Sequence, residues 1–212
     1  RTGPMTPVLY EHPFAAYCWK ALIAFYECGV DFERAFVDGT DEARAELAEL
    51  WPVASIPVLV DGDRVLGESS TIIEYVTPRL VPGIVARLWD RVIDGQVMTP
   101  MQKIVADSLR PADARDPYGV EESRATLDRA YRVLEAQLAE QWLAGPQFTI
   151  ADCGAAPALF YATVVHRWDE AAHPRLTDYF ARLTARPSVT RVIDDARPYR
   201  PIFPLPWPSH VP

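Results

Sequence analysis

Two short segments have the residue types and the spacing needed to hold a small peptide. Pro57 precedes the branched run Val58-Leu59, and because proline cannot donate a hydrogen bond to a sheet, it belongs at the first position of a strand. The bond between Ile56 and Pro57 can also adopt the cis form. The backbone N–H and C=O of Ile56 are then left unpaired, so an extended peptide could add there as a further strand.

Glu68 and Ser69 supply the second part of such a site, one short hairpin further along the chain. They stand where a helix is predicted to begin. The free N–H groups and the positive dipole end of that helix attract a carboxylate, while the Glu68 carboxylate can accept a hydrogen bond from an ammonium group. Together the two segments predict a site for a short peptide whose end carries both an amino group and a carboxylate.

The elements that position these residues follow the order βαβαββα within residues 5–80, which is the thioredoxin-like arrangement. Residues 1–4, ahead of Met5, are interpreted as an expression remnant and set aside. Gly29 is expected to stop the first helix, and Pro52 the second. The predicted strands are 7–11, 31–37, 58–60 and 65–66, the last two joined by the turn Asp61-Gly62-Asp63, and the predicted helices are 17–28, 41–50 and 69–80.

After Val81-Pro82-Gly83 only helical periodicity remains, so residues 84–212 are predicted to form a second, all-helical domain. Thr149 and Asp152 have the spacing of a capping box, which begins a helix by reciprocal hydrogen bonds, and we assign both to folding and not to catalysis. The predicted helices are 84–109 with a kink at Pro100, 120–143, 150–168, 174–185 and 188–196.

The chain ends in a proline-rich tail that also carries large apolar residues. A solvated linker would carry charge in place of aromatic rings. Two interpretations stay open: an extended strap packed on the domain surface, or a segment in which Phe203 or Trp207 forms part of a roof over a pocket.

Composition favours a cytoplasmic enzyme and disfavours several other classes. A net charge of −8 over 212 residues argues against nucleic acid and anionic membranes as partners. No stretch reaches the ~18 apolar residues of a membrane span or has the pattern of a signal peptide. The odd number of cysteines indicates reduced thiols, and the histidines lack ligand spacing, so no metal site is predicted. These residues are Cys18, Cys28, Cys153, His12, His166, His173 and His210.

Five segments, in their order and spacing, resemble the glutathione transferase family over nearly the whole chain. They are Val8-Leu9-Tyr10, the helix 19–25 that ends at Gly29, Ile56-Pro57-Val58-Leu59, Glu68-Ser69-Ser70-Thr71-Ile72 and Phe148-Thr149-Ile150-Ala151-Asp152. The resemblance is to cytosolic-type bacterial members of the serine/cysteine type. It implies the glutathione transferase fold, glutathione as cosubstrate and a homodimer. It also implies that the γ-glutamyl end of glutathione binds Glu68 and Ser69 while the cysteinyl backbone pairs with Ile56 and Pro57.

The group that would activate the thiol is the chief departure from the family pattern. Serine-type members carry a hydroxyl between the first strand and the first helix, and this position, in contact with glutathione, is Ala15 here. Alanine cannot donate a hydrogen bond, and Ala16 is no better. The nearest catalytic candidates are Tyr17, where some bacterial relatives carry a cysteine that touches glutathione, and Cys18. The Tyr17 phenol could donate to a thiolate, whereas Cys18 could itself be a thiolate activated by the helix dipole. The alternative for Cys18, which Trp19 follows, is that its side chain faces the core.

A second departure concerns the basic residue with which relatives commonly bind the glycine carboxylate of glutathione. Val53-Ala54-Ser55 stands at that place, and the loss of a charge-assisted hydrogen bond should weaken binding by about 1 kcal/mol. Lys20 is the candidate to compensate.

The acceptor substrate is expected to bind between the two halves, because domain interfaces favour ligand sites. The candidate wall residues are mainly apolar, which implies a small apolar electrophile, and Trp168 and the tail aromatics are expected to join them. The wall candidates are His12, Phe14, Met98, Met101, Gln102 and Val105.

Three functions therefore remain open from the sequence. The first is a glutathione transferase that adds the glutathione thiolate to a small electrophile. The second is a glutathione-dependent thiol/disulfide reductase that uses Cys18. The third is a non-catalytic glutathione- or ligand-binding protein that kept the fold and lost the donor at Ala15.

Overall fold

A four-stranded mixed sheet forms the centre of the first half. The computed structural model describes residues 6–209 and 211. The strands are β1 (Val8–Glu11), β2 (Glu33–Phe36), β3 (Val58–Asp61) and β4 (Arg64–Leu66), in the order β2-β1-β3-β4. Strand β1 runs parallel to β2 and antiparallel to β3, so that Leu9 lies opposite both Arg34 and Leu59. The predicted βαβ unit followed by a hairpin is confirmed.

Three helices accompany the sheet: α1 (Ala16–Cys28), α2 (Asp41–Leu50) and α3 (Ser69–Val76). Gly29 ends α1 with a φ of 62°, a left-handed conformation that glycine adopts readily. Helix α3 is shorter than the predicted 69–80. Thr77 precedes Pro78 and leaves the helical region, and a 3₁₀ turn follows at Pro78–Leu80.

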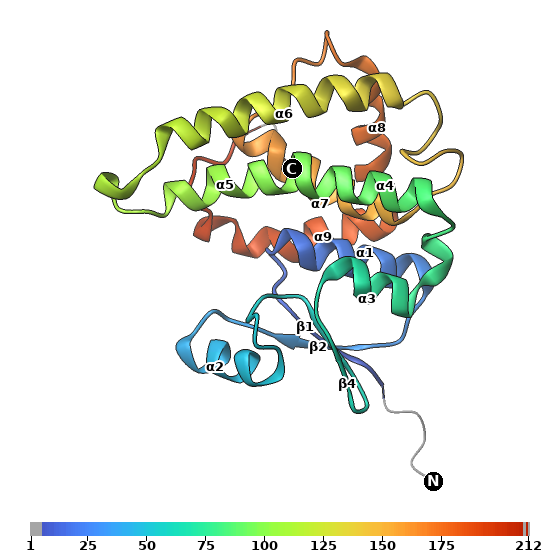
Figure 1. Ribbon diagram of the computed structural model, residues 1–212, viewed down its shortest axis with the longest axis vertical. Helices are drawn as coiled ribbons and strands as arrows, with labels where there is room; N and C mark the ends of the chain where they lie inside the picture. Colours follow the sequence, from blue (N-terminus) through green and yellow to red (C-terminus); the bar gives the residue numbers. More distant parts are fainter. Residues whose placement is uncertain (1–5, 210, 212) are drawn as a thin grey trace.

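The two faces of the sheet are covered by different helices. Leu9 and Leu59 point into the main core with α1 and α3, whereas Val58 on the other face packs with Leu47 of α2. Helices α1 and α3 therefore lie between the sheet and the helical half, with α2 on the outside (Figure 1). The alternation of apolar residues along β3 produces this arrangement.

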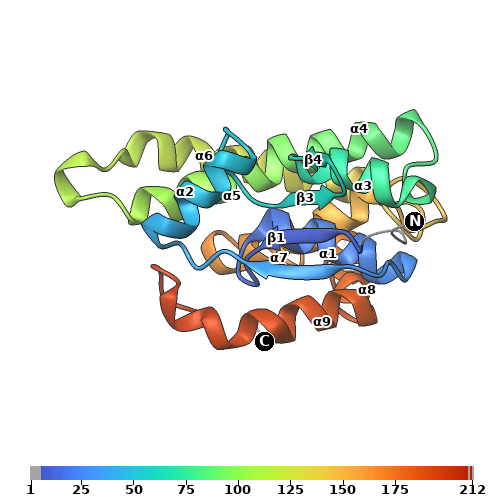
Figure 2. The ribbon, with the colours of Figure 1, turned by 90° about the horizontal axis from the view of Figure 1, so that it is seen from below.

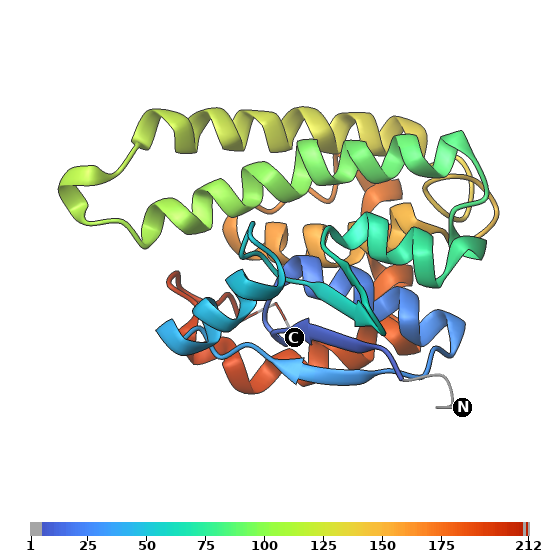
Figure 3. The same cartoon turned by 60° about the horizontal axis from the view of Figure 1, so that its bottom comes forward.

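In the part of the chain that the structure describes, the sheet half is followed by helices and their connecting loops, with no further named strand. Helices α5 and α6 run side by side and project from the rest (Figure 3), while α9 packs along α1 on the side away from α4 (Figure 2). No helix among the described residues is long and apolar enough to cross a membrane. The predicted fold class, a thioredoxin-like first half and an all-helical second half, is confirmed. The helices are α4 (Ile84–Ile93), α5 (Thr99–Ser108), α6 (Pro117–Gln137), α7 (Ile150–Val165), α8 (Pro174–Thr184) and α9 (Pro187–Ala196), with a final 3₁₀ turn at Arg197–Ile202.

The irregularity predicted at Pro100 is a π turn that precedes the proline. Residues Asp94–Met98 form this turn and join α4 to α5. Pro100 has no N–H to donate to the carbonyl four residues before it, and the wider turn accommodates that loss. The backbone N–H and the hydroxyl of Thr99 both donate to the carbonyl of Asp94, the hydroxyl at 2.8 Å.

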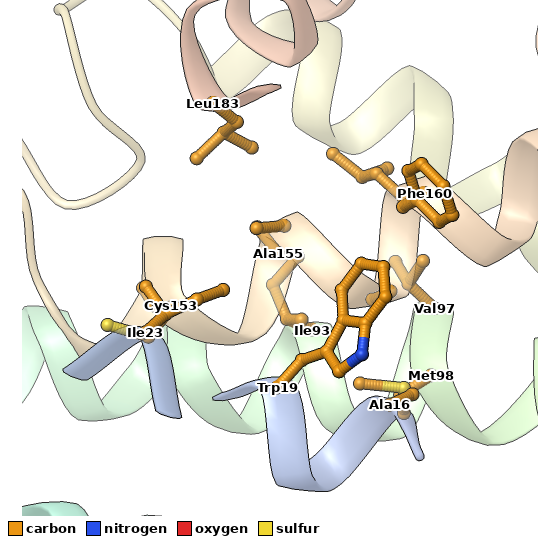
Figure 4. Close-up of a cluster of buried hydrophobic side chains, with 14 of the residues drawn as sticks. Ala16, Trp19, Ile23, Ile93, Val97, Met98, Cys153, Ala155, Phe160 and Leu183 are labelled. Atoms are coloured by element: carbon orange, nitrogen blue, oxygen red, sulfur yellow. The ribbon is translucent and has the colours of Figure 1, made fainter. Parts of the chain in front are cut away.

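One continuous hydrophobic core serves both halves. Trp19 of α1 is fully buried beside Met98 of the π turn and Phe160 of α7 (Figure 4). Its indole N–H donates to the carbonyl of Pro13 at 2.6 Å. Helix α1 therefore belongs to the packing of both halves.

The proposed domain limits, 5–80 and 84–212, stay a prediction. Their outer ends fall on Met5 and Pro212, which lie outside the described residues together with residues 1–4 and His210. Within the described part, the 3₁₀ turn that closes the first half ends at Leu80 and α4 begins at Ile84.

The capping box predicted at Thr149 is present at the start of α7. The Thr149 side chain accepts from the first turn, and the Asp152 carboxylate accepts from the Thr149 N–H at 2.8 Å. The same carboxylate accepts from the Leu143 N–H at 3.0 Å and from the Tyr179 hydroxyl at 2.6 Å. Asp152 thus ties α7 to α8 and to the preceding loop, which agrees with a role in folding.

A buried ionic cluster joins the two halves beside the core. Lys20 of α1 is 0% exposed, and its ammonium lies 2.6 Å from Asp90 Oδ1 and 2.7 Å from Asp94 Oδ2. It also donates to Ser70 Oγ at 2.9 Å, and Ser70 donates to Asp90 at 2.8 Å. Burial raises the pKa of the Asp94 carboxyl, and the Lys20 ammonium opposes that rise. The cluster fixes α1, α3, α4 and the π turn relative to one another.

Replacing Lys20 with Met should destabilise the protein by about 3 to 5 kcal/mol, because it leaves the buried Asp90 carboxylate and the partly buried Asp94 carboxylate without their cation. Denaturant unfolding measures the loss. Lys103→Met is the matched control: its pair with Asp116 is 2.7 Å long but both side chains are partly exposed, so the cost should be at most about 1 kcal/mol. Equal stability of the two variants would contradict the structural role of Lys20.

Candidate functional site

The segment Gly67-Glu68-Ser69 makes a sharp entry into α3. Gly67 packs so closely on Trp51 that a Cβ would lie 2.3 Å from a ring carbon, so only glycine fits without movement of the ring. Glu68 has a φ of 63°, which is uncommon for a residue with a side chain and is found at ligand clamps. Ser69 is the first residue of α3, and Ser70 after it is held by Lys20. The exposed Glu68 carboxylate and the N-terminus of α3 are therefore fixed side by side.

The backbone just before β3 is open for pairing. The Ile56–Pro57 peptide bond is cis, and β3 begins at Val58. Within the described part of the chain, neither the N–H nor the C=O of Ile56 forms a hydrogen bond. Ile56 thus offers a donor and an acceptor, as a docked peptide backbone requires. It lies next to Glu68 and Ser69 at the start of α3, which are here called the clamp.

Three hollows meet at Ile56. The first, here called the polar hollow, has a volume of about 520 Å³ and lies between the clamp and the π turn; it is lined by Tyr17, Ser55, Ile56, Pro57, Glu68, Ser69, Arg91, Asp94, Gly95 and Thr99. The second, the apolar hollow, has a volume of about 390 Å³; it is lined by Phe14, Ala15, Ala16, Tyr17, Ile56, Met101, Gln102, Val105, Ala106, Leu109, Tyr161, Ile202, Phe203 and Pro204.

The third hollow, here called the α2 hollow, has a volume of about 400 Å³ and lies on the α2 side of Ile56. It is lined by His12, Phe14, Ala15, Val37, Asp38, Gly39, Arg44, Leu47, Ala54, Ile56 and Ile202. The polar and α2 hollows each contain one arginine, Arg91 and Arg44. Between residues 6 and 209, and at 211, no group of three or more His, Cys, Asp or Glu side chains could hold a metal ion.

Tyr17 stands on the boundary between the polar and apolar hollows, because it lines both. Burial raises the pKa of the Tyr17 phenol to about 12, with the Asp94 carboxylate adding to the rise and a contact with Thr99 opposing it. The phenol is therefore protonated at neutral pH. It can donate a hydrogen bond to an anion, and it cannot act as a base.

The start of α1 offers further donors beside Tyr17. Ala15 is the N-cap, and its carbonyl accepts from Cys18 and Trp19. The N–H groups of Ala16 and Tyr17 make no hydrogen bond to any described residue. Free N–H groups at the first turn of a 13-residue helix, with its dipole behind them, favour a bound anion.

Comparison with known proteins agrees with this geometry. The family described as "Glutathione S-transferase, N-terminal domain" matches residues 9–79, and "Glutathione S-transferase, C-terminal domain" matches residues 117–182. The chain is 31% identical over 209 residues to glutathione S-transferase 3 of Zea mays, covering 89% of this chain and 94% of that protein. The chain belongs to the glutathione S-transferase family.

Two further similarities show the breadth of this family. The solved structure of glutathione S-transferase III in apo form is 28% identical, with a TM-score of 0.76, and the match covers 96% of this chain and 100% of that one. A stringent starvation protein A homolog of Coxiella burnetii is 31% identical over 159 residues, covering 72% of this chain and 74% of that protein.

Cys18 lies in the core, so of its two sequence interpretations the activated thiolate is wrong. The side chain is 0% exposed, and burial raises the pKa of its thiol. Helix α1 packs against α3, α7 and α9 and is buried on almost every side, so the position after Tyr17 lies in the core. A substrate disulfide could not reach this sulfur.

Lys20 does not compensate for the missing cation of the glycine subsite. Its ammonium is fully buried, where it binds Asp90 and Asp94. The arginine of the α2 hollow, Arg44, is the cation on that side of Ile56.

The candidates for the acceptor wall lie in different parts of the molecule. Phe14, Met101, Gln102 and Val105 line the apolar hollow. Met98 does not, because the π turn directs it into the core beside Trp19, where it is 0% exposed (Figure 4).

The other two candidates lie elsewhere. His12 lines the α2 hollow, and burial lowers the pKa of its imidazole. Trp168 is buried against Tyr131 and Phe180, away from the residues of the three hollows. Its place in the predicted wall is wrong.

The proline-rich tail closes one side of the apolar hollow. Ile202, Phe203 and Pro204 line it, and Trp207 packs behind them against Phe14 and Phe203 with ring centroids 6.0 and 5.4 Å apart. The tail therefore packs on the domain surface and also covers the apolar hollow, which the sequence had left open as two alternatives.

Several lining residues carried no signal in the sequence. Arg91, Asp94 and Thr99 belong to no motif. They reach the clamp because the Lys20 cluster, through Ser70, Asp90 and Asp94, joins α4 and the π turn to α3. Tyr161 reaches the apolar hollow from α7, and its hydroxyl donates to the Phe14 carbonyl at 2.9 Å. Helical periodicity could assign these residues to a face, but not to a hollow shared by two halves.

Proposed function

We propose that this chain is an enzyme that binds glutathione across the three hollows and transfers its thiolate to a small apolar electrophile. The observation that carries the proposal is that a polar hollow, an apolar hollow and a third hollow all share Ile56. Glutathione has three parts of matching character: an amino-acid end, a thiol and a glycyl carboxylate. A tripeptide paired to the open backbone of Ile56 reaches all three hollows.

Each part of glutathione has a proposed partner. The γ-glutamyl end lies in the polar hollow, where Glu68 accepts from its ammonium and the Ser69 N–H donates to its carboxylate. The cysteinyl backbone pairs with Ile56, before Pro57. The glycyl carboxylate points to the α2 hollow, where Arg44 is the available cation.

The groups that stabilise the glutathione thiolate are the Tyr17 phenol and the N–H groups at the start of α1. The free thiol has a pKa near ~8.5, and lowering it by about two units requires roughly 2.7 kcal/mol of preferential thiolate stabilisation. Ala15 supplies only backbone and a methyl group. The neutral phenol of Tyr17 and the N–H groups of Ala16 and Tyr17 are hydrogen-bond donors on the boundary where the sulfur would lie.

The transfer step follows from the position of that boundary. The thiolate sulfur donates an electron pair to an electrophilic carbon in the apolar hollow and forms an S–C bond; the leaving group departs with its own pair, or an addition product takes a proton from water. The walls of this hollow, from Phe14 to Phe203, lower the local dielectric and strengthen the hydrogen bonds to the sulfur. They also favour an apolar acceptor.

A second candidate is a protein that binds glutathione without conjugating it. One observation favours it: Ala15 stands where serine-type members have a hydroxyl, so this position offers no side-chain donor to the thiolate. Conjugation of a generic aryl halide separates the two candidates. The third possibility from the sequence, a reductase using Cys18, is not retained because that sulfur is buried.

We also propose a cytoplasmic homodimer of the bacterial type, without a nucleic-acid or membrane partner. An apolar face on α4 supports pairing, since Ile84, Val85 and Leu88 are 78%, 47% and 54% exposed. Tyr75 of α3 is a further exposed ring in the first half. Two-fold pairing through such a face is the commonest solution.

Replacing Glu68 with Ala should weaken glutathione binding by about 1 to 3 kcal/mol, because the ammonium loses a charged acceptor. Calorimetric titration measures the effect. Glu74→Ala is the matched control, since Glu74 lies on the same helix but pairs with Arg87 on the surface, and it should leave the affinity unchanged. If Glu68→Ala binds glutathione with wild-type affinity, the role of Glu68 in binding the ammonium group is rejected.

Replacing Tyr17 with Phe should raise the pKa of the bound glutathione thiol, and Ala15→Ser should lower it. One hydrogen bond to an anion contributes about 1.5 to 3 kcal/mol, or roughly one to two pKa units. Thiolate absorbance in the ultraviolet, followed against pH, gives the value directly. Cys18→Ala is the control and should leave it unchanged. The account fails if Cys18→Ala abolishes conjugation while Tyr17→Phe has no effect.

Light scattering at micromolar concentration should give twice the chain mass of 23.8 kDa. Leu88→Arg should shift the mass toward that of one chain, because the α4 face would bury a charge without a partner. A wild-type monomer would remove the homodimer from the proposal.

A further inference from the structure

Arg91 is the cation of the polar hollow, and nothing in the fold requires its charge. It extends from α4 into the lining beside Glu68 and Ser69, and its side chain is 69% exposed. Its one ionic contact among the described residues is 4.0 Å long, to Asp90. That carboxylate is already bound by Lys20 at 2.6 Å and by Ser70 at 2.8 Å. The guanidinium is therefore available to a ligand.

The rest of the hollow is acidic. The Glu68 and Asp94 carboxylates line it, and the ammonium of Lys20 that faces Asp94 is fully buried behind it. A ligand carboxylate at the Ser69 N–H would share the hollow with these two acidic side chains, and like charges disfavour its ionised form. The first turn of an eight-residue helix offers only a partial positive charge against them. A full cation lining the same hollow therefore favours the bound carboxylate.

We propose that Arg91 binds the α-carboxylate of the γ-glutamyl end of glutathione, opposite the ammonium held by Glu68. This inference rests on the proposed function. The planar guanidinium suits a carboxylate because it can donate two parallel hydrogen bonds. The polar hollow then selects ligands whose end carries an ammonium and a carboxylate on one carbon, as a γ-linked glutamyl group does. Arg91 also makes the helical half a direct partner of glutathione, since it lies on α4.

The test compares two ligands on wild-type protein and on Arg91→Gln by calorimetric titration. One ligand is glutathione, and the other is 4-aminobutanoyl-cysteinylglycine, which keeps the amino group and lacks the α-carboxylate. Arg91→Gln should bind glutathione about 10- to 100-fold more weakly than wild type. It should bind the decarboxylated peptide as wild type does. Arg91→Lys should fall between wild type and Arg91→Gln for glutathione, because it keeps the charge and loses the paired donors.

Arg87→Gln is the matched control. Arg87 lies one turn earlier on α4 and pairs with Glu74 at 3.0 Å, so its loss should not change the affinity for either ligand. Light scattering on each variant shows that the oligomeric state is retained.

The outcomes separate this inference from the proposed function. Wild type that does not bind glutathione would reject both. Wild type that binds glutathione, with Arg91→Gln binding it equally well, would reject the role of Arg91 alone. An equal loss for both ligands would also reject it, because a carboxylate-specific contact cannot weaken a peptide that has no such carboxylate.

Discussion

The buried ammonium of Lys20 is the interaction on which the site depends. It joins Ser70 of α3 to Asp90 of α4 and Asp94 of the π turn, and those three segments supply Ser69, Arg91 and Asp94 to the polar hollow. Gly154 of α7 lies against the aliphatic stem of the same lysine. A buried ionic cluster gains little net stability over a set of apolar residues that replaces all its members, but it tolerates only one arrangement of its partners. We infer that this constraint holds the clamp at the junction of the two halves.

The lining of the site changes from polar to apolar at Tyr17 and Ile56, which border both hollows. On one side lie carboxylates, a guanidinium and helix N–H groups; on the other lie aromatic rings, methionine and valine. A thiolate placed on this boundary keeps its hydrogen bonds on the polar side and faces an apolar acceptor on the other. The raised pKa of the Tyr17 phenol fits this arrangement, because a phenol that stays protonated is a dependable donor.

The sequence predicted the residues whose position is set by local backbone rules. Pro57 fixed the start of β3, Glu68 and Ser69 marked the start of α3, and the Thr149–Asp152 pair marked the start of α7. It failed where the position depends on packing between the halves. Met98 and Cys18, which the sequence offered as site candidates, face the core. Lys20 is buried among carboxylates and does not supply the missing cation, and Arg91 reaches the clamp from α4, which local patterns could not relate to it. The π turn, which decides where Met98 and Asp94 point, has no signature beyond the proline that follows it.

A crystal structure with an S-alkyl derivative of glutathione tests the central claim most directly, because the ligand contains all three parts that the hollows should separate. The account predicts the sulfur within hydrogen-bond distance of the Tyr17 hydroxyl, the γ-glutamyl end on Glu68 and Ser69, and the alkyl chain in the apolar hollow against Met101 and Phe203. A sulfur remote from Tyr17, or an alkyl chain outside that hollow, would contradict it.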